Sequence, residues 1–149
     1  MKITTLASGS KGNCTLVETE KTKILIDAGI SLAEIEKKLE ILKVNPFDIQ
    51  GIIITHEHSD HIKSVGAFSR KYNSLVFANH EEWPVLLHKI GNINSENKRS
   101  FVESEFIIND LGVRSFELSH DSNKLFITFF GAHPKSVAIE NLLPLLKNE

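Results

Sequence analysis

The stretch Gly51-Ile52-Ile53-Ile54-Thr55-His56-Glu57-His58-Ser59-Asp60-His61 decides the fold class of this chain. It begins with a short, almost wholly apolar run, the pattern of a strand that is buried on both faces of a sheet. Three histidines and an aspartate follow directly, where that strand would end. Open α/β sheets bind their ligands beyond the carboxyl ends of their strands. The stretch therefore predicts an α/β fold with its functional site immediately after this strand.

The rest of the chain fits this fold class, because strand-like and helix-like patterns alternate along it. Before the stretch, strands are expected at residues 2–6, 14–18 and 23–27, and a helix at residues 32–42. After it, a helix through residues 62–68, a strand at 75–78 and a helix at 83–91 are expected. Further strands are expected at 101–102, 106–108, 113–118 and 125–130, and a short helix at 137–146. No repeat or linker divides the chain, so a single domain spanning residues 1–149 is predicted.

The histidine cluster has the chemistry of a metal site. Imidazole and carboxylate are ligands of divalent metals such as Zn, Mn and Fe, and no thiolate lies near the cluster to favour a softer ion. His56 and His58 are two residues apart and His61 opens the next helix, so their rings can point into one cleft. The alternative is that Ser59 and Asp60 only cap that helix. Capping explains none of the histidines, and the metal site is therefore the preferred interpretation.

Composition limits the partners and the compartment. The 149 residues carry 17 Lys and Arg against 19 Asp and Glu, a net charge of −2, so no strong field recruits nucleic acid or an anionic membrane to the whole chain. No apolar run is long enough to span a membrane, and the first residues lack the apolar core of a secretory signal. Cys14 is alone, which fits a reducing compartment. The expectation is a cytoplasmic domain without a membrane partner.

Several motifs together resemble those of a known family. They are Leu6-Ala7-Ser8-Gly9-Ser10 with Gly12-Asn13, Leu25-Ile26-Asp27-Ala28-Gly29, the histidine motif, and Ser119-His120-Asp121. The histidine motif is similar to the metal signature of the metallo-β-lactamase-fold hydrolases. The wider set resembles the YycJ/WalJ-like branch, which is linked to 5′-to-3′ exonuclease action on DNA. The resemblance covers residues 1 to about 121 and implies an α/β fold, a partial αββα sandwich with its first half and the start of its second.

The resemblance also implies roles for individual residues. A first divalent metal, Zn or Mn, would be held by His56, His58 and His120, and a second by Asp60 and His61. Metal-bound hydroxide would attack a phosphodiester, with Asp60 as the catalytic carboxylate that orients or helps to deprotonate the nucleophile. DNA is the substrate that this branch suggests.

Asp27 has two readings. It could only cap a turn at the end of its strand, or it could lie under the metal ligands and orient one of them, as the resemblance implies.

The sequence departs from the family pattern after residue 121. The resemblance places a bridging aspartate in a Thr-Asp-x-Gly strand end, whereas this chain has Thr128-Phe129-Phe130-Gly131. The domain is therefore expected to be C-terminally incomplete, with one tight metal site and a weak second one, unless His133 or Asp121 replaces the missing ligand. Two functions stay open: a metal-dependent phosphodiesterase, or a truncated, weakly active or inactive relative that retains part of a metal site.

Other polar segments have two readings each. The loop at residues 8–13 is either a tight turn or a rim of the site that could bind an anion. Lys63, Arg70 and Lys71 either meet phosphates or form a solvated helix face, and the solvated face is the default. His80 and His88 lack metal spacing and are expected at the surface or in packing roles. Self-association is expected at strands 113–118 and 125–130, whose apolar faces would lack part of their cover.

Overall fold

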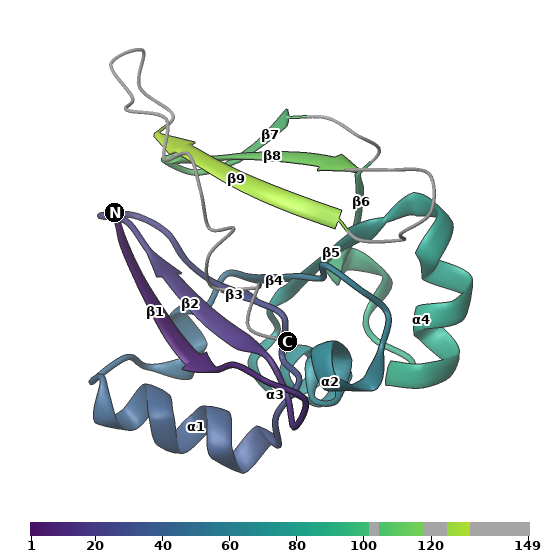
Figure 1. Ribbon diagram of the computed structural model, residues 1–149, viewed down its shortest axis with the longest axis horizontal. Helices are drawn as coiled ribbons and strands as arrows, with labels where there is room; N and C mark the ends of the chain where they lie inside the picture. The colour runs from purple at the N-terminus through teal and green to yellow at the C-terminus, as the bar shows by residue number, and fades with distance from the viewer. Residues whose placement is uncertain (102–104, 118–124, 132–149) are drawn as a thin grey trace.

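The structure of the chain, a computed structural model, describes residues 1–101, 105–117 and 125–131; for residues 116, 117 and 125–131 it describes the backbone alone. Three layers follow one another in Figure 1: helices, a six-stranded sheet, and a three-stranded sheet. The predicted α/β sandwich is thus present. None of the helices in these residues is long and apolar enough to cross a membrane.

The six-stranded sheet follows the order of its strands along the chain. Its strands are β1 (Lys2–Ala7), β2 (Cys14–Glu18), β3 (Lys23–Ile26), β4 (Gly51–Ile53), β5 (Leu75–Asn79) and β6 (Lys98–Phe101). The first three pair antiparallel, and β3 to β6 pair parallel. Since β4 lies in the middle of the parallel part, the histidine motif leaves the sheet at the carboxyl edge, as the sequence predicts.

Four α-helices connect these strands: α1 (Leu32–Ile41), α2 (Ser59–Ile62), α3 (Val65–Tyr72) and α4 (Trp83–Ile90). Short 3-10 turns lie at Pro46–Asp48, His80–Glu82 and Ser95–Asn97. Helix α1 begins with the predicted capping box, in which the Ser31 hydroxyl accepts from the Glu34 amide and the Glu34 carboxylate accepts from the Ser31 amide.

The prediction of a single helix through residues 62–68 is wrong in one respect. The chain forms two helices, α2 and α3, which are separated at Lys63 and Ser64. Ser64 is buried, its amide donates to the Ala28 carbonyl (2.8 Å), and its hydroxyl donates to the Ile30 carbonyl (2.5 Å). These contacts tie the junction to the loop after β3, so the helix breaks where that loop crosses it.

The second sheet has the antiparallel order β7 (Glu105–Ile108), β8 (Leu111–Glu117) and β9 (Leu125–Gly131). The turn between β7 and β8 is shorter than expected, because β8 already begins at Leu111. Asn109 adopts a left-handed φ of 51° in this turn, a conformation that asparagine tolerates. The helix expected at residues 137–146 lies outside the described residues.

Alternation along the strands of the first sheet divides the core into two parts. Leu16, Leu25 and Ile52 pack toward the helices, whereas their neighbours Val17 and Ile53 pack toward the second sheet. Both clusters are closed to solvent. Burial on both faces explains why the strand before the histidines has no polar side chain.

Candidate metal centre

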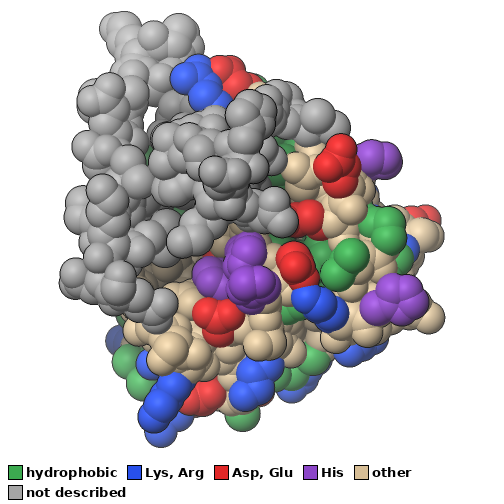
Figure 2. All heavy atoms as spheres, turned by 45° about the vertical axis from the view of Figure 1, so that its right-hand side comes forward, with side chains coloured by type: hydrophobic (Ala, Val, Ile, Leu, Met, Phe, Trp, Pro, Cys, Tyr) green, Lys and Arg blue, Asp and Glu red, His purple; other side chains and the backbone are tan. Residues whose placement is uncertain are grey.

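Four of the predicted ligands lie together after the end of β4. The ring centroids of His56 and His58 are 3.7 Å apart, and those of His56 and His61 are 5.5 Å apart. The Asp60 Oδ2 lies 3.5 Å from the Nε2 of His61. Figure 2 shows histidine side chains gathered on one face of the molecule, with acidic and basic side chains beside them.

Asp27 holds one of these histidines in place. This carboxylate is buried at the end of β3, where its residue adopts a left-handed φ of 59°. Its Oδ1 accepts from the Thr55 amide (2.8 Å), and its Oδ2 accepts from the Thr55 hydroxyl (2.6 Å) and lies 2.7 Å from the Nδ1 of His61. An imidazole that donates its Nδ1–H to a carboxylate presents Nε2 as its ligating nitrogen. The contact supports the reading of Asp27 as an orienting residue.

The loop at residues 8–13 is the predicted tight turn and also lies beside the site. It is a tight turn, in which the Gly12 amide donates to the Gly9 carbonyl (3.0 Å) and both glycines have positive φ angles. It also rims the site, because the Asn13 amide donates to the Asp60 carbonyl (2.8 Å). The Asn13 Nδ2 lies 3.3 Å from the Asp60 carboxylate. The loop therefore fixes the position of the candidate catalytic carboxylate.

Gly29 allows this close approach. A Cβ atom at this position would lie 1.6 Å from the Asp60 carbonyl oxygen and 2.8 Å from the Asn13 nitrogen. The Gly29 amide also donates to the Asn13 carbonyl (2.8 Å). No side chain fits between these three backbone segments, so the glycine is required for the packing of α2 against the loop.

A charged pair supports the histidine loop from the other side. The ammonium group of Lys89, in the last turn of α4, donates to the Glu57 carbonyl (3.1 Å) and contacts the Glu57 carboxylate. The hydrogen bond from the Lys89 ammonium to the Glu57 carboxylate lowers the pKa of Glu57 below its usual range. Glu57 therefore stays ionised, and the lysine places a positive charge beside the histidines.

The donor chemistry of the cluster fits a divalent metal. In the part of the chain that the structure describes, no three His, Cys, Asp or Glu side chains are placed to share one ion. The imidazole rings of His56 and His58 lie edge to face. The resemblance assigns a further ligand to His120, which lies outside the described residues, as do the alternatives Asp121 and His133.

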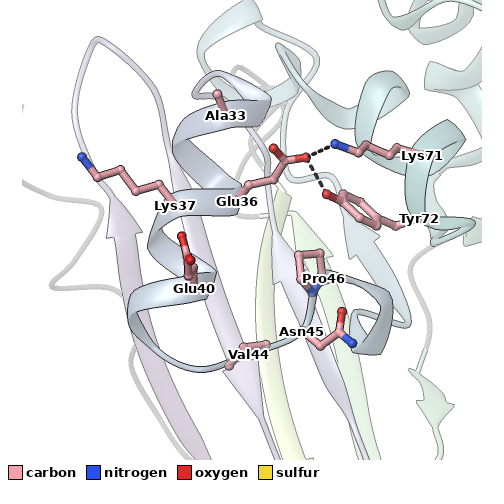
Figure 3. Close-up of a pocket in the computed structure, with 9 residues that line it drawn as sticks. All are labelled: Ala33, Glu36, Lys37, Glu40, Val44, Asn45, Pro46, Lys71 and Tyr72. Carbon is pink, nitrogen blue, oxygen red and sulfur yellow. Dashed lines mark hydrogen bonds and ion pairs between the residues drawn. The ribbon is translucent and has the colours of Figure 1, made fainter.

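Two surface cavities differ in their chemistry. One, of about 580 Å³, lies between α1 and α3 (Figure 3), where Glu36 accepts from the Lys71 ammonium (2.7 Å) and the Tyr72 hydroxyl (2.5 Å). This triad satisfies its own charges and contains no histidine. The other, of about 720 Å³, is lined by His58, Ser59, Asp60, Ile62, Lys63 and Lys89. The second cavity is the one adjacent to the candidate metal ligands.

Comparison with known proteins identifies the family. Residues 7–136 match the family described as the metallo-β-lactamase superfamily. The chain belongs to this superfamily. Its fold is also found in solved metallo-β-lactamases, including GOB-18 from Elizabethkingia meningoseptica (TM-score 0.66, 18% identity, 87% of this chain and 54% of that one). The subclass B3 enzyme MEM-A1 from a soil metagenome library gives a TM-score of 0.69 at 19% identity, over 91% of this chain and 58% of that one.

Curated superfamily relatives are more similar in sequence. The chain is 39% identical over 135 residues to the exodeoxyribonuclease YycJ of Bacillus anthracis, which covers 90% of this chain and 51% of that protein. It is 40% identical over 124 residues to the exodeoxyribonuclease WalJ of Streptococcus pneumoniae, over 81% of this chain and 46% of that protein. The chain therefore spans about half the length of these relatives, and the predicted resemblance to their branch is confirmed. Superfamily membership implies a divalent metal.

Sequence reasoning missed two of the supporting contacts. It noted Asn13 only as part of a motif and gave no role to Lys89, because each reaches the site across a long separation along the chain. The structure separates the three basic residues that follow the motif, Lys63, Arg70 and Lys71. Arg70 donates to the carbonyls of Ile90 and Asn92, and Lys71 pairs with Glu36.

Proposed function

We propose that this chain carries the metal-binding part of a metal-dependent phosphodiesterase that acts on DNA. The observation that supports this most is the contact of the buried Asp27 with His61, beside the rings of His56 and His58. A carboxylate below a histidine is the arrangement that fixes a ring for metal binding. The names of the two bacterial relatives suggest the substrate class.

The residues would divide the work of holding metal. His56 and His58, with His120 as the resemblance implies, would hold one Zn or Mn ion, and Asp60 and His61 would contribute to a second. A divalent metal supplies a Lewis acid and lowers the pKa of water that it binds to ~7.

The protein's own side chains would orient the reacting groups and accept protons. Asp60 would accept a proton from an attacking water, a role that is supported by its place beside His58 in the lining of the cleft. Asn13 fixes the main chain of Asp60 through a 2.8 Å hydrogen bond, and its side-chain amide lies 3.3 Å from the carboxylate. Asp27 and Thr55 hold His61 in one orientation, which avoids reorganisation when substrate binds.

A weakly active relative is the second candidate, and one observation favours it. Phe129 stands where the resemblance expects a bridging carboxylate, on β9, and its backbone pairs with Val113 of β8. Without that carboxylate, the repulsion between two dications about 3.5–4 Å apart is not offset. We therefore expect one metal to bind tightly and the second weakly.

Metal content and turnover together test the proposal. Purified protein should contain about one equivalent of Zn or Mn and cleave a DNA strand, and His58→Ala should lose both properties. The matched control is His88→Ala, because His88 is exposed on α4 and is not among the candidate ligands. Less than about half an equivalent of transition metal in wild-type protein, unchanged in His58→Ala, would contradict metal binding here. Metal binding without cleavage of DNA, with cleavage gained by Phe129→Asp, would favour the weakly active relative.

A further inference from the structure

The cleft beside the candidate metal ligands is lined by more basic than acidic side chains. Six residues line the cleft, whose volume is about 720 Å³. Two of them, Lys63 and Lys89, are basic, and one, Asp60, is acidic. The cleft volume lies within the range of about 300–1,000 Å³ that is typical of ligand pockets. His58 and Asp60 belong both to this cleft and to the candidate metal centre, so a molecule in the cleft would extend from the reacting position.

Lys63 is exposed at the junction of α2 and α3. In the part of the chain that the structure describes, the Lys63 side chain forms no hydrogen bond or salt bridge, and its charge helps to lower the pKa of Glu34 in α1. Arg70 and Lys71, the other basic residues after the motif, are engaged with carbonyl groups and with Glu36. Of the three candidates in the sequence for meeting phosphate, Lys63 is the one that lines the cleft.

Lys89 approaches the same cleft from α4. An ammonium group has three donors, and contact with Glu57 uses donors toward its carbonyl and its carboxylate. The Lys89 side chain is 42% exposed, so its remaining donor can reach an anion in the cleft. The pair with Glu57 also fixes the direction from which this lysine approaches.

We infer that this cleft binds a backbone phosphate of the DNA strand adjacent to the linkage that is cleaved, with Lys63 and Lys89 as its cationic contacts. The inference rests on the proposed function and adds the substrate-binding residues to it. Lysine ammonium groups bind phosphate oxygens as point charges and do not require bidentate geometry, which suits a flexible strand. The carboxylate of Asp60 would repel a phosphate, and the two lysines offset this repulsion within the same cleft.

Binding can be measured separately from cleavage. The probe is a fluorescent single-stranded oligodeoxynucleotide with phosphorothioate linkages, followed by anisotropy with metal-loaded protein at several salt concentrations. Each phosphate contact with a single strand contributes ~0.7 to the slope of log affinity against log salt concentration. Between ~50 and ~200 mM salt, this corresponds to a loss of affinity of about 2.6-fold per contact.

The variants are Lys63→Gln, Lys89→Gln and their combination. Lys63→Gln should weaken binding about threefold or more at low salt and reduce the slope by ~0.7, and the double variant should reduce it by ~1.4. Lys63→Arg should restore the slope because it keeps the charge. The matched control is Lys37→Gln, which removes another exposed lysine, at the cavity of Figure 3, and should change neither quantity.

Three outcomes would overturn the inference, and they differ in what they imply for the proposed function. If wild-type protein cleaves DNA and Lys63→Gln and the double variant bind the strand with unchanged affinity and slope, the cleft is not the binding site, although the proposed function stands. If wild-type protein neither cleaves nor binds the strand, the proposed function fails and the inference fails with it. A strand with neutral methylphosphonate linkages that binds as tightly as the charged strand would also refute phosphate recognition.

Discussion

Gly29→Ala should disrupt the candidate metal centre although it replaces none of the candidate ligands. The new Cβ would lie 1.6 Å from the Asp60 carbonyl oxygen, so the loop and α2 must separate. That separation breaks two backbone hydrogen bonds of 2.8 Å, from Asn13 to Asp60 and from Gly29 to Asn13. With ~1 kcal/mol for each bond and ~2 kcal/mol for overpacking, the free energy of unfolding should fall by about 4 kcal/mol. At ~2–4 °C per kcal/mol, the melting temperature should fall by about 8–16 °C.

The assay combines thermal unfolding followed by circular dichroism with metal analysis of the folded protein at low temperature. The matched control is Gly66→Ala, whose Cβ would lie 2.0 Å from the Ile90 carbonyl oxygen, between α3 and α4. Both variants should melt earlier, but only Gly29→Ala should also lose metal, because only it displaces α2, whose N-cap is the candidate ligand His58 and which carries Asp60. A Gly29→Ala protein that keeps its melting temperature within about 2 °C and binds metal like wild type would refute this account of the site.

Three further changes test separate parts of the structure. Burial raises the pKa of Asp110, but hydrogen bonds from the hydroxyls of Thr19 and Thr22 outweigh burial and lower this pKa overall. The ionised Asp110 therefore stabilises the folded protein above the ordinary carboxyl pKa, and this stabilisation is lost as the pH falls through the lowered pKa. Asp110→Ala should therefore cost ~2 kcal/mol in urea unfolding at neutral pH, and the difference from wild type should shrink in acid. Asp27→Asn should weaken metal binding ~10–100-fold in competition with a chelator, with the fold retained in circular dichroism. Ile107, which is 62% exposed on β7, should contribute to self-association; Ile107→Lys should lower the mass found by light scattering, and a wild-type protein that is monomeric at micromolar concentrations would refute this.

The strands and helices could be predicted where local signals are strong. The apolar run before the histidines is β4, and the Ser31 and Glu34 pattern is the start of α1. These signals are local because alternation, capping and turn preferences act over a few residues. The identity of the candidate ligands was local too, since four of them lie within residues 56–61.

The contacts that support the site could not be predicted in the same way. Asn13 reaches Asp60 across 47 positions, and Lys89 reaches Glu57 across 32. The break between α2 and α3 depends on hydrogen bonds from Ser64 to the loop after β3. No short-range pattern carries this information, because a serine inside a helical pattern can equally face solvent.

The candidate site therefore depends on two parts of the fold to different degrees. The positions of Asp60 and His61 are set by Asn13, Asp27 and Gly29, all from the first sheet and its loops. His120, which the resemblance names as a metal ligand, follows β8 along the sequence. The second sheet is joined to the first by the apolar core between them and by the hydrogen bonds of Asp110. Loosening the second sheet should therefore affect His120 first, whereas changes around Asp27 should affect the imidazole of His61 directly. Asp110→Ala and Asp27→Asn then distinguish the two dependences, because the first should alter stability more than the affinity for metal, and the second should do the reverse.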